Sequence, residues 1–439
     1  MSERLGHLKK LEIRGLFDSK NYVFDLDLKE PTLLTGSNGS GKSSILRIVN
    51  AVGMGAWRHF LSLPVRSASL EFEHGTIFTL EKSTTSKTAL VATLNGRKCE
   101  FDAADTLDYT ITDEELLELV PGLTVAGSTM SGSMYLYRGE YVDRRELFTF
   151  LPDALSPRSS QDGFDAITDF AENFHLLFVT DQRLVVSEEK FGSPRHRPTR
   201  TANRTAADLS AREIGRQMQK ALSDYASVSQ RFDRDFPNRV VKAMASEEEV
   251  PVDRIERLLR DVEREREALQ KVGLLPRDLS SEAFQGLPLH EISVRPVIET
   301  FITDTKRKFE TLADLRERLT LFAEFLNQHY ENKRVVTSPK DGFKVEIDGD
   351  PERTIGPAQL SSGEQQMLVL AFEILFHAEP GTLVLIDEPE LSLHVLWQDT
   401  FIDDLSRMGA VRDLQFILAT HSPSLIGGRD DLKRTLDAR

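Results

Sequence analysis

Cysteine is almost absent from this sequence of 439 residues. Cys99 is its only cysteine, which excludes an internal disulfide and any cysteine-rich metal site. A lone cysteine of this kind is more typical of a small buried apolar residue than of a reactive thiol. We therefore do not expect redox chemistry.

Long hydrophobic runs are also lacking. No run approaches the ~20 apolar residues that a membrane span needs, and residues 1–15 lack the apolar core of a secretory signal. Basic residues (55) are outnumbered by acidic ones (70), which gives a formal net charge of −15. This balance argues against a surface attracted to nucleic acid throughout, although it leaves a local basic strip open. We expect a cytoplasmic protein with no membrane partner.

The composition that remains is that of an ordinary globular protein. Apolar residues make up 40% and charged residues 28% of the chain. Alternating patterns in residues 8–35 predict two or three strands that lead to Gly36, and a helix with Ile45, Leu46, Ile48 and Val49 on its apolar face should follow. Residues 65–101 predict hairpins with glycine-containing turns.

The middle of the chain, residues 206–330, has a helical pattern rich in charge. Its longest apolar stripe consists of Leu312, Leu315, Leu319, Phe322 and Leu326. The stripe suits a helix packed inside the chain, or less readily an intermolecular coiled coil. Pro237 and residues 273–290 are expected to interrupt this region, so no long coiled-coil arm is predicted. Beyond residue 340 strands and helices resume, with the apolar runs TLVLI and QFILAT as buried strands.

Residues 36–43 read GSNGSGKS, which matches the full phosphate-binding-loop pattern between a predicted strand and a predicted helix. Glycines allow backbone N–H groups to surround phosphate oxygens, and the helix N-terminus adds its positive end. Lys42 would reach the outer phosphates of ATP, and Ser43 would ligate Mg²⁺. The residues assigned to the nucleotide from this loop are Gly36, Asn38, Gly39, Gly41, Lys42, Ser43 and Ser44.

A second motif follows the apolar run TLVLI, where Asp387, Glu388 and Pro389 end a predicted buried strand. If this strand neighbours the one before Gly36, its carboxylates emerge beside the phosphate loop. Asp387 would then hold Mg²⁺, and Glu388 would polarise the attacking water as a catalytic residue. A turn that only ends a strand is the alternative.

Two further signals lie nearby in the sequence. Residues 360–365 read LSSGEQ directly before an apolar helix, where Ser361 and Glu364 can form a capping box or an anion site, and the two are compatible. His421 follows the run QFILAT at a strand end. Such a histidine taken alone is more often structural than catalytic.

Together these motifs resemble the ATP-binding-cassette class of ATPases, in its soluble RecF, Rad50 and OLD-like branch (AAA15- or AAA21-type). The resemblance is close over residues 8–60 and 340–426. It implies an α/β ATPase head with mixed β-sheets that is split by a helical insertion. The expected domains are 1–185 as the first part of the head, 186–335 as the mainly helical insertion, and 336–439 as the second part.

The resemblance also implies a composite site. Ser361 and Gly363, with Glu364, would stand in the signature motif that contacts the terminal phosphate of ATP held by the opposite subunit. His421 would be the catalytic switch histidine, and residues 390–394 would cross the dimer interface. Gln182 is expected to sense the nucleotide and its Mg²⁺, unless it is an ordinary surface glutamine. ATP would thus join a homodimer, or a larger homo-oligomer.

Among relatives, the order of the motifs in the head most resembles that of the ATPase subunits of PARIS-type anti-phage defence systems. Retron- and Septu-associated ATPases come next. That resemblance implies a sensor that responds to a phage-derived trigger and controls a separately encoded nuclease of the TOPRIM type. Only 18 residues follow His421, too few for such a nuclease, so we expect the nuclease to come from a partner unless the chain is truncated.

Two rivals to the defence function stay open. The first is a RecF- or SMC-like DNA-repair ATPase that clamps DNA, and the second, weaker one is the energising subunit of a transporter. A basic strip in the loop 191–206 could bind DNA or RNA phosphates, although a solvated loop is the simpler interpretation. The strip consists of Arg195, Arg197, Arg200 and Arg204.

Overall fold

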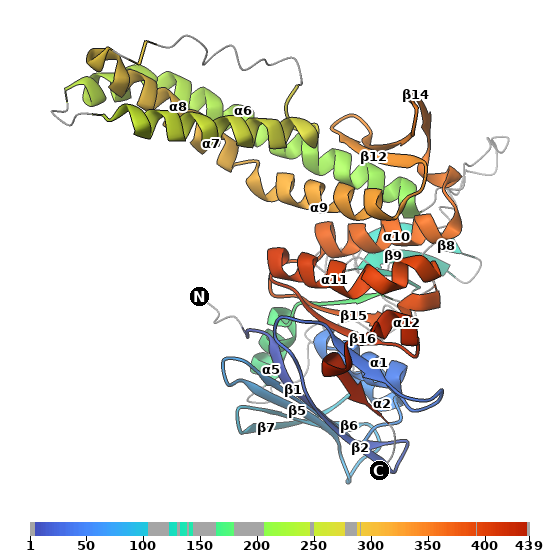
Figure 1. Cartoon of the computed structure of the whole chain (residues 1–439). Helices are drawn as coiled ribbons and strands as arrows, with labels where there is room; N and C mark the ends of the chain where they lie inside the picture. Colours follow the sequence, from blue (N-terminus) through green and yellow to red (C-terminus); the bar gives the residue numbers. More distant parts are fainter. Residues whose placement is uncertain are drawn as a thin grey trace, which may run out of the picture. The chain divides into compact units, whose positions relative to one another are not determined.

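The computed structural model describes most of the chain and divides it into two compact units (Figure 1). Unit 1 comprises Met1–Thr205 and Phe372–Arg439, and unit 2 comprises Ala206–Ala371. The described residues are 5–103, 123–129, 132–137, 140–143, 164–179, 206–245, 250–276, 288–289, 291–391 and 393–436.

A five-stranded parallel sheet forms the centre of unit 1. The strand order is β11 (Leu176–Val179), β15 (Leu383–Asp387), β16 (Gln415–Ala419), β3 (Thr32–Thr35) and β17 (Lys433–Thr435). The runs TLVLI and QFILAT form the interior strands β15 and β16, and the first four residues of β15 and all of β16 are buried, as predicted. Because all four pairings are parallel, the carboxyl ends of the strands meet at one edge of the sheet.

Helices cover both faces of this parallel sheet (Figure 1). On one side lies α1 (Lys42–Gly53), and on the other α11 (Val395–Arg412). The predicted apolar face of α1 is buried, and so are its last four residues. This all-round burial follows because α1 also packs against the antiparallel sheet of unit 1. Among the described residues, unit 1 also contains the α-helices α2 (Trp57–Ser62), α5 (Phe164–Asn173) and α12 (Pro423–Ile426).

The antiparallel sheet of unit 1 has six strands in the order β2-β1-β4-β5-β6-β7. Its predicted hairpins turn at Gly75 and Gly96, both with positive φ. Gln415 links this sheet to the parallel one, since its amide bonds the backbone of Leu8 in both directions, at 2.7 and 2.8 Å. The strands are β1 (Leu8–Leu16), β2 (Lys20–Asp25), β4 (Ser67–Phe72), β5 (Ile77–Lys82), β6 (Ala89–Leu94) and β7 (Arg97–Asp102). A further sheet contains β8 (Thr124–Thr129), β9 (Gly132–Tyr137) and β10 (Glu140–Asp143).

Unit 2 is mainly helical, as the charged pattern of residues 206–330 predicts. The apolar stripe that begins at Leu312 is buried within the chain along α9, which favours internal packing over an intermolecular coiled coil. A three-stranded antiparallel sheet and the start of α10 follow. The elements are α6 (Ala206–Met244), α7 (Val252–Lys271), α8 (Arg295–Glu310), α9 (Ala313–His329), β12 (Lys333–Ser338), β13 (Gly342–Ile347), β14 (Asp350–Ile355) and α10 (Ser362–Phe372).

The expectation that Pro237 interrupts the helical region is wrong, because Pro237 lies inside α6, a single helix of 39 residues. Proline removes one helical hydrogen bond, and two contacts of Arg239 offset this loss. Its guanidinium donates to the carbonyl of Phe232 on the preceding turns at 2.6 Å and to Asp304 of α8 at 2.7 Å. Ring contacts between Phe236 and Phe301 add to the packing of α6 on α8.

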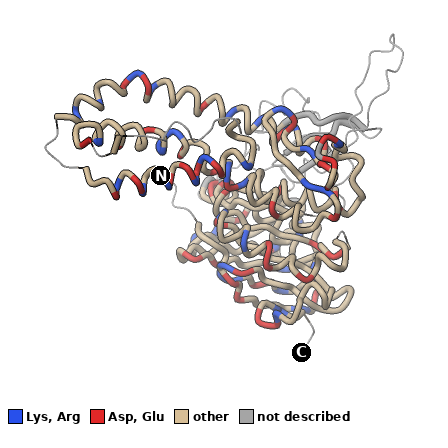
Figure 2. The backbone as a smooth tube through the Cα atoms, turned by 45° about the horizontal axis from the view of Figure 1, so that its top comes forward, with Lys and Arg blue, Asp and Glu red and all other residues tan. Residues whose placement is uncertain are grey.

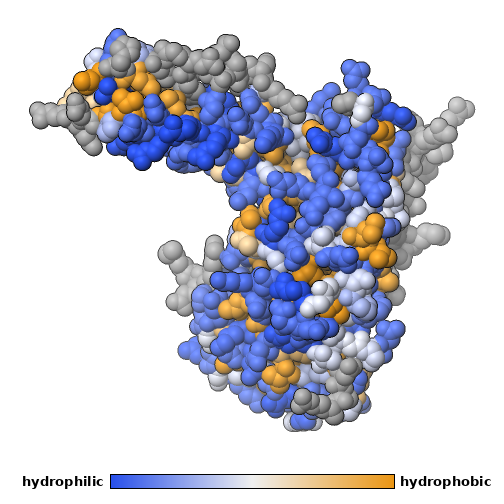
Figure 3. All heavy atoms as spheres, in the orientation of Figure 1, coloured by the Kyte–Doolittle hydropathy of each residue, from blue (hydrophilic) through white to orange (hydrophobic). Residues whose placement is uncertain are grey.

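The described surface is mixed in charge and largely polar. Basic and acidic residues are interspersed along the helices of unit 2 (Figure 2). Hydrophobic side chains gather in separate areas of an otherwise mostly hydrophilic face (Figure 3). Within the described parts of the chain, we find no helix that is both long and apolar enough to cross a membrane. The fold is therefore the mixed α/β, phosphate-loop type that the sequence predicts.

Candidate functional site

The site begins at the loop that joins β3 to α1. Gly39 and Gly41 have φ angles of 78° and 110°, which side-chain-bearing residues rarely adopt. At Gly41 a Cβ atom would also lie 2.6 Å from Cδ2 of Leu16. Glycine at position 41 is thus required both by the backbone conformation and by the close approach of β1.

Lys42 folds back over this loop. Its Nζ donates to the carbonyl oxygens of Gly36 at 2.9 Å and Ser37 at 3.4 Å, and the residue is only 5% exposed. The ammonium therefore lies within the loop, at the place where the backbone N–H groups and the start of α1 also concentrate positive charge.

Ser43 joins the loop to the end of β15. Its Oγ donates to Oδ1 of Asp387 at 2.9 Å. The condition of adjacent strands, under which the sequence places these residues together, is not met, because β16 lies between β3 and β15. The residues meet because α1 packs across β16 and β15. A hydroxyl and a carboxylate are hard oxygen ligands, so this pair fits Mg²⁺.

One cavity of about 270 Å³ collects most of the predicted residues of unit 1. Glu388 and His421 reach it from the ends of β15 and β16. Glu388 has a φ of 46°, unusual for a non-glycine residue, and its N–H donates to Ala419 at 2.9 Å. Strain of this kind concentrates at functional sites. The lining residues are Phe17, Asn38, Gly39, Gly41, Lys42, Ser43, Ser44, Glu388 and His421.

His421 lies beside two carboxylates. Its Nδ1 is 3.2 Å from Oε1 of Glu390 and 3.9 Å from Oε1 of Glu388. The histidine side chain is 43% exposed, whereas that of Glu390 is 7% exposed. The catalytic pair predicted from the sequence is thus brought together, with a buried carboxylate behind it.

The signature segment lies in unit 2, and its capping box is present. The carboxylate of Glu364 accepts hydrogen bonds at 2.9 Å from the N–H and the Oγ of Ser361, and one at 2.6 Å from Nζ of Lys333. Burial alone would raise the pKa of Glu364, but these hydrogen bonds outweigh it and hold the pKa below its ordinary value of 4.5. Burial and this carboxylate together raise the pKa of the Tyr330 hydroxyl, which donates to the Glu364 carbonyl at 2.7 Å. Gly363 is part of the first turn of α10.

Several predicted residues lie outside the described part of the chain. These are Gln182 and the basic strip Arg195, Arg197, Arg200 and Arg204. Conversely, two residues at the site are not among the predicted nucleotide-binding or catalytic residues. Phe17, at the tip of the β1–β2 hairpin, lines the cavity, and Glu390 contacts His421. Neither contact has a local signal, because each depends on chain segments distant in sequence.

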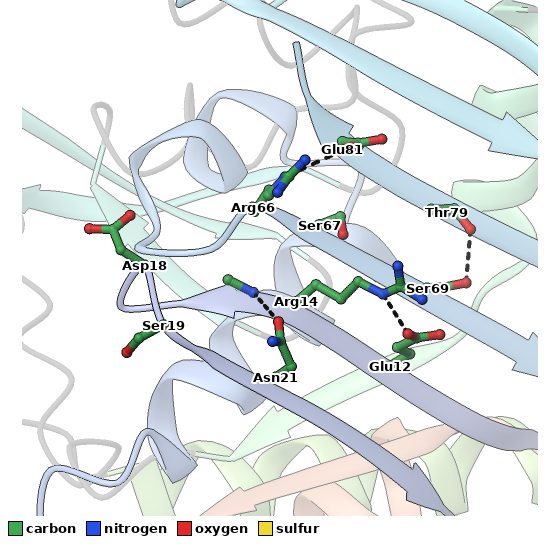
Figure 4. Close-up of a pocket in the computed structure, with 11 residues that line it drawn as sticks. Glu12, Arg14, Asp18, Ser19, Asn21, Arg66, Ser67, Ser69, Thr79 and Glu81 are labelled. Atoms are coloured by element: carbon green, nitrogen blue, oxygen red, sulfur yellow. Dashed lines mark hydrogen bonds and ion pairs between the residues drawn. The ribbon is translucent and has the colours of Figure 1, made fainter. Parts of the chain in front are cut away.

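A second, larger pocket of about 780 Å³ lies on the outer face of the antiparallel sheet (Figure 4). Its two arginines are already opposed by carboxylates: Arg14 donates to Glu12 at 2.5 Å, and Arg66 lies 3.8 Å from Glu81. Asp18 adds a third acidic group. Neither arginine of this pocket is thus free of an acidic partner, and the smaller cavity at the phosphate loop is the better candidate site.

Fold and site together define a P-loop protein built to bind the phosphates of a nucleotide. A magnesium ion held by Ser43 and Asp387 would draw its other ligands from phosphate and water. Within the described residues, no cluster of three or more histidine, cysteine, aspartate or glutamate side chains could hold a metal by itself.

Comparisons with known proteins agree with this class. Residues 254–427 match the family described as "AAA domain, putative AbiEii toxin, Type IV TA system". This match supports the predicted resemblance to an ATPase of the AAA21 type. The matched stretch contains LSSGEQ, the end of β15 and His421, whereas the phosphate loop precedes it. No curated protein matches the chain.

Solved structures that overlay on the chain include heads of SMC proteins. The Smc head domain of Pyrococcus furiosus, with an extended coiled coil and bound to the C-terminal domain of ScpA, is 15% identical. The overlay covers 96% of this chain and 91% of that one, with a TM-score of 0.35. For the SMC head domain from Thermotoga maritima the identity is 12%, the coverages are 97% and 92%, and the TM-score is 0.36. Scores this low carry no argument about function.

Proposed function

We propose that this protein is an ABC-type ATPase that hydrolyses ATP with Mg²⁺ at the cavity beside the phosphate loop. The observation that carries the proposal is the 2.9 Å contact between Ser43 and Asp387, beside Glu388 and His421 on the same cavity. Phosphoryl transfer requires positioning and neutralisation of charge more than covalent chemistry, and the cavity provides both.

Each group has a distinct part in this proposal. Lys42 and the loop N–H groups bind the outer phosphates, and Phe17 offers an exposed ring on which a purine base can stack. Mg²⁺, when bound to Ser43 and Asp387, would neutralise phosphate charge. Glu388 orients the attacking water and accepts its proton, and His421 contacts the terminal phosphate.

We further propose that the site is completed by the signature segment of a second copy, with Ser361 and Gly363 on its terminal phosphate. Exposed apolar side chains next to Glu388 support such an association. Leu391 is 62% exposed, and Val395 and Leu396 are similarly open to solvent at the start of α11. A cluster of exposed apolar side chains is typical of a protein–protein interaction site.

ATP turnover by the purified protein tests the hydrolytic role. Glu388→Gln removes the carboxylate but keeps the side chain's size, so turnover should fall at least about 100-fold while ATP still binds. Glu379→Gln, a matched change at a 72% exposed glutamate of the same unit, should leave turnover unchanged. Undiminished hydrolysis by Glu388→Gln would show that another group activates the water.

At the level of the cell, we propose that the protein is the sensor and regulator of a bacterial anti-phage system that controls a separate nuclease. The matched family's description, "AAA domain, putative AbiEii toxin, Type IV TA system", supports this class of role. The rival is a RecF- or SMC-like ATPase that clamps DNA.

Infection of a host that carries the gene with its neighbouring reading frames separates the two roles. For defence, protection from phage should require Lys42 and Glu388, and a nuclease should co-purify in fixed stoichiometry. ATP turnover that is stimulated by DNA, without protection or a nuclease partner, would contradict defence and favour the clamp.

A further inference from the structure

The side chain of Glu390 is only 7% exposed, although Leu391 beside it is 62% exposed. Glu390 belongs to the short helical turn Pro389–Leu391 after β15. Its Oε1 accepts hydrogen bonds at 2.9 Å from both Oγ1 of Thr420 and the backbone N–H of His421. The turn after β15 is thus tied to the end of β16, and the Glu390 side chain points inward while Leu391 remains at the surface.

The same carboxylate oxygen is the nearer acceptor for the imidazole of His421. It lies 3.2 Å from Nδ1, compared with 3.9 Å for the carboxylate of Glu388. A buried carboxylate is a stronger acceptor than an exposed one, because less water competes for it. A hydrogen on Nδ1 would have Glu390 as its nearest carboxylate, and Nε2 would then be the nitrogen that can meet a ligand in the cavity.

A contribution to stability alone does not explain why a glutamate stands at position 390. Its second oxygen, Oε2, is buried and has no hydrogen-bond partner among the described residues. A buried polar atom without a partner costs about 1–3 kcal/mol, and such groups in native structures often serve a function. A side chain with one acceptor, or none, would fill the space at lower cost.

We propose that Glu390 is a positioning residue that fixes the ring and tautomer of His421. Glu390 does not line the cavity, so it acts through the histidine. By accepting the Nδ1 hydrogen, it also leaves the carboxylate of Glu388 free to orient water. This inference rests on the proposed hydrolysis, in which His421 contacts the terminal phosphate.

A double-mutant cycle tests the coupling between the two residues. Glu390→Gln keeps the size and one acceptor but removes the charge, so kcat should fall at least about tenfold with little change in KM. In a His421→Ala background the same substitution should change kcat by less than about twofold, because its route to the site is already gone. An equal loss in both backgrounds would mean that Glu390 only supports the fold.

Thr420→Val provides a second variant for the structural contribution. It removes the hydroxyl that donates to Glu390 but leaves the backbone N–H and the imidazole of His421 beside that carboxylate. If positioning is the role, this variant should lose stability in urea unfolding but retain kcat within about threefold. A loss of kcat as large as that of Glu390→Gln would overturn the proposal.

The tautomer of the His421 imidazole can be measured without an assay of ATP turnover. Long-range ¹H–¹⁵N spectra, with the His421 signal assigned by its loss in His421→Ala, should show the hydrogen on Nδ1 in the wild type and a shift to Nε2 in Glu390→Gln. An unchanged tautomer would overturn the proposal. A wild-type protein with this tautomer but without ATP turnover would contradict the proposed hydrolysis and leave the positioning intact.

Discussion

At the scale of single residues, the site depends on a few charges held in place by the backbone. Lys42 is the clearest case, because its ammonium is kept inside the phosphate loop by the carbonyls of Gly36 and Ser37. The partners it uses are main-chain atoms that any sequence would supply. Its charge is therefore available to phosphate oxygens, for which two carbonyls are weak competitors.

Lys42→Ala should weaken ATP binding at least about 100-fold, because it removes a charge-assisted contact to the outer phosphates. Titration with a fluorescent ATP analogue measures the loss. Lys87→Ala, at an exposed lysine of the same unit, serves as the control and should bind normally. Equal binding by the wild type and Lys42→Ala would remove the loop from the nucleotide site.

Residue-scale features were only partly predictable. The loop, Asp387, Glu388 and His421 are marked by local sequence patterns, and the structure brings them together. The contact of Glu390 with His421 joins positions 31 apart in the chain, and no periodicity or spacing reports such a pairing.

At the scale of elements, the short turns around the site restrict which residue can stand at a position more than the helices and strands do. Gly41 combines a positive φ with a close approach to Leu16, whereas Gly96 has a positive φ of 82° and open space around it. Substitution of Gly96 therefore measures the effect of backbone strain alone, whereas substitution of Gly41 adds a steric clash.

Gly41→Ala should cost roughly 1–3 kcal/mol of unfolding free energy and abolish ATP binding, because the added methyl displaces Leu16 or the loop. Gly96→Ala should cost roughly 1–2 kcal/mol and bind ATP normally. Urea unfolding and ATP titration measure both. Normal nucleotide binding by Gly41→Ala would show that the loop tolerates the displacement.

The start of α10 makes a prediction about pH. The pKa of Glu364 is lowered in the folded protein, so its contribution is present above the unfolded value near 4.5 and is lost as the pH falls through the lower, folded pKa. Glu364→Gln should cost roughly 1.5–3 kcal/mol at pH 7. The difference from the wild type should shrink in urea unfolding below pH 4.5. A difference that persists in acid would mean that the charge does not stabilise this helix start.

The element pattern itself was largely predictable. Alternation and the apolar runs predict β1, β3, β15 and β16, since each of these strands has a clear polar or buried face. The three-residue strand β17 is too short to carry a period, and only its pairing with β3 identifies it as a strand. At Pro237 a local rule was overridden, and Arg239 contacts both the preceding turns of α6 and Asp304 of α8 there.

At the scale of the whole molecule, the phosphate loop lies in unit 1 and the signature segment in unit 2. If a second copy completes the site, the apolar group that starts at Leu391 should be covered when ATP binds. Leu396→Ser should then weaken ATP-dependent dimerisation in light scattering, with ATP binding by the monomer preserved. Ile77→Ser, at another exposed apolar residue of unit 1, is the matched control. Equal dimerisation by the two variants would place the interface elsewhere.

The most direct test of the central claim, ATP as a switchable contact between two copies, is the mass of the Glu388→Gln protein with and without Mg²⁺ and ATP. Without its water-orienting carboxylate, the protein should bind ATP and remain dimeric in its presence. The wild type should return to its starting mass as the ATP is consumed. A Glu388→Gln protein whose mass is unchanged by ATP, although it binds the nucleotide, would contradict the claim.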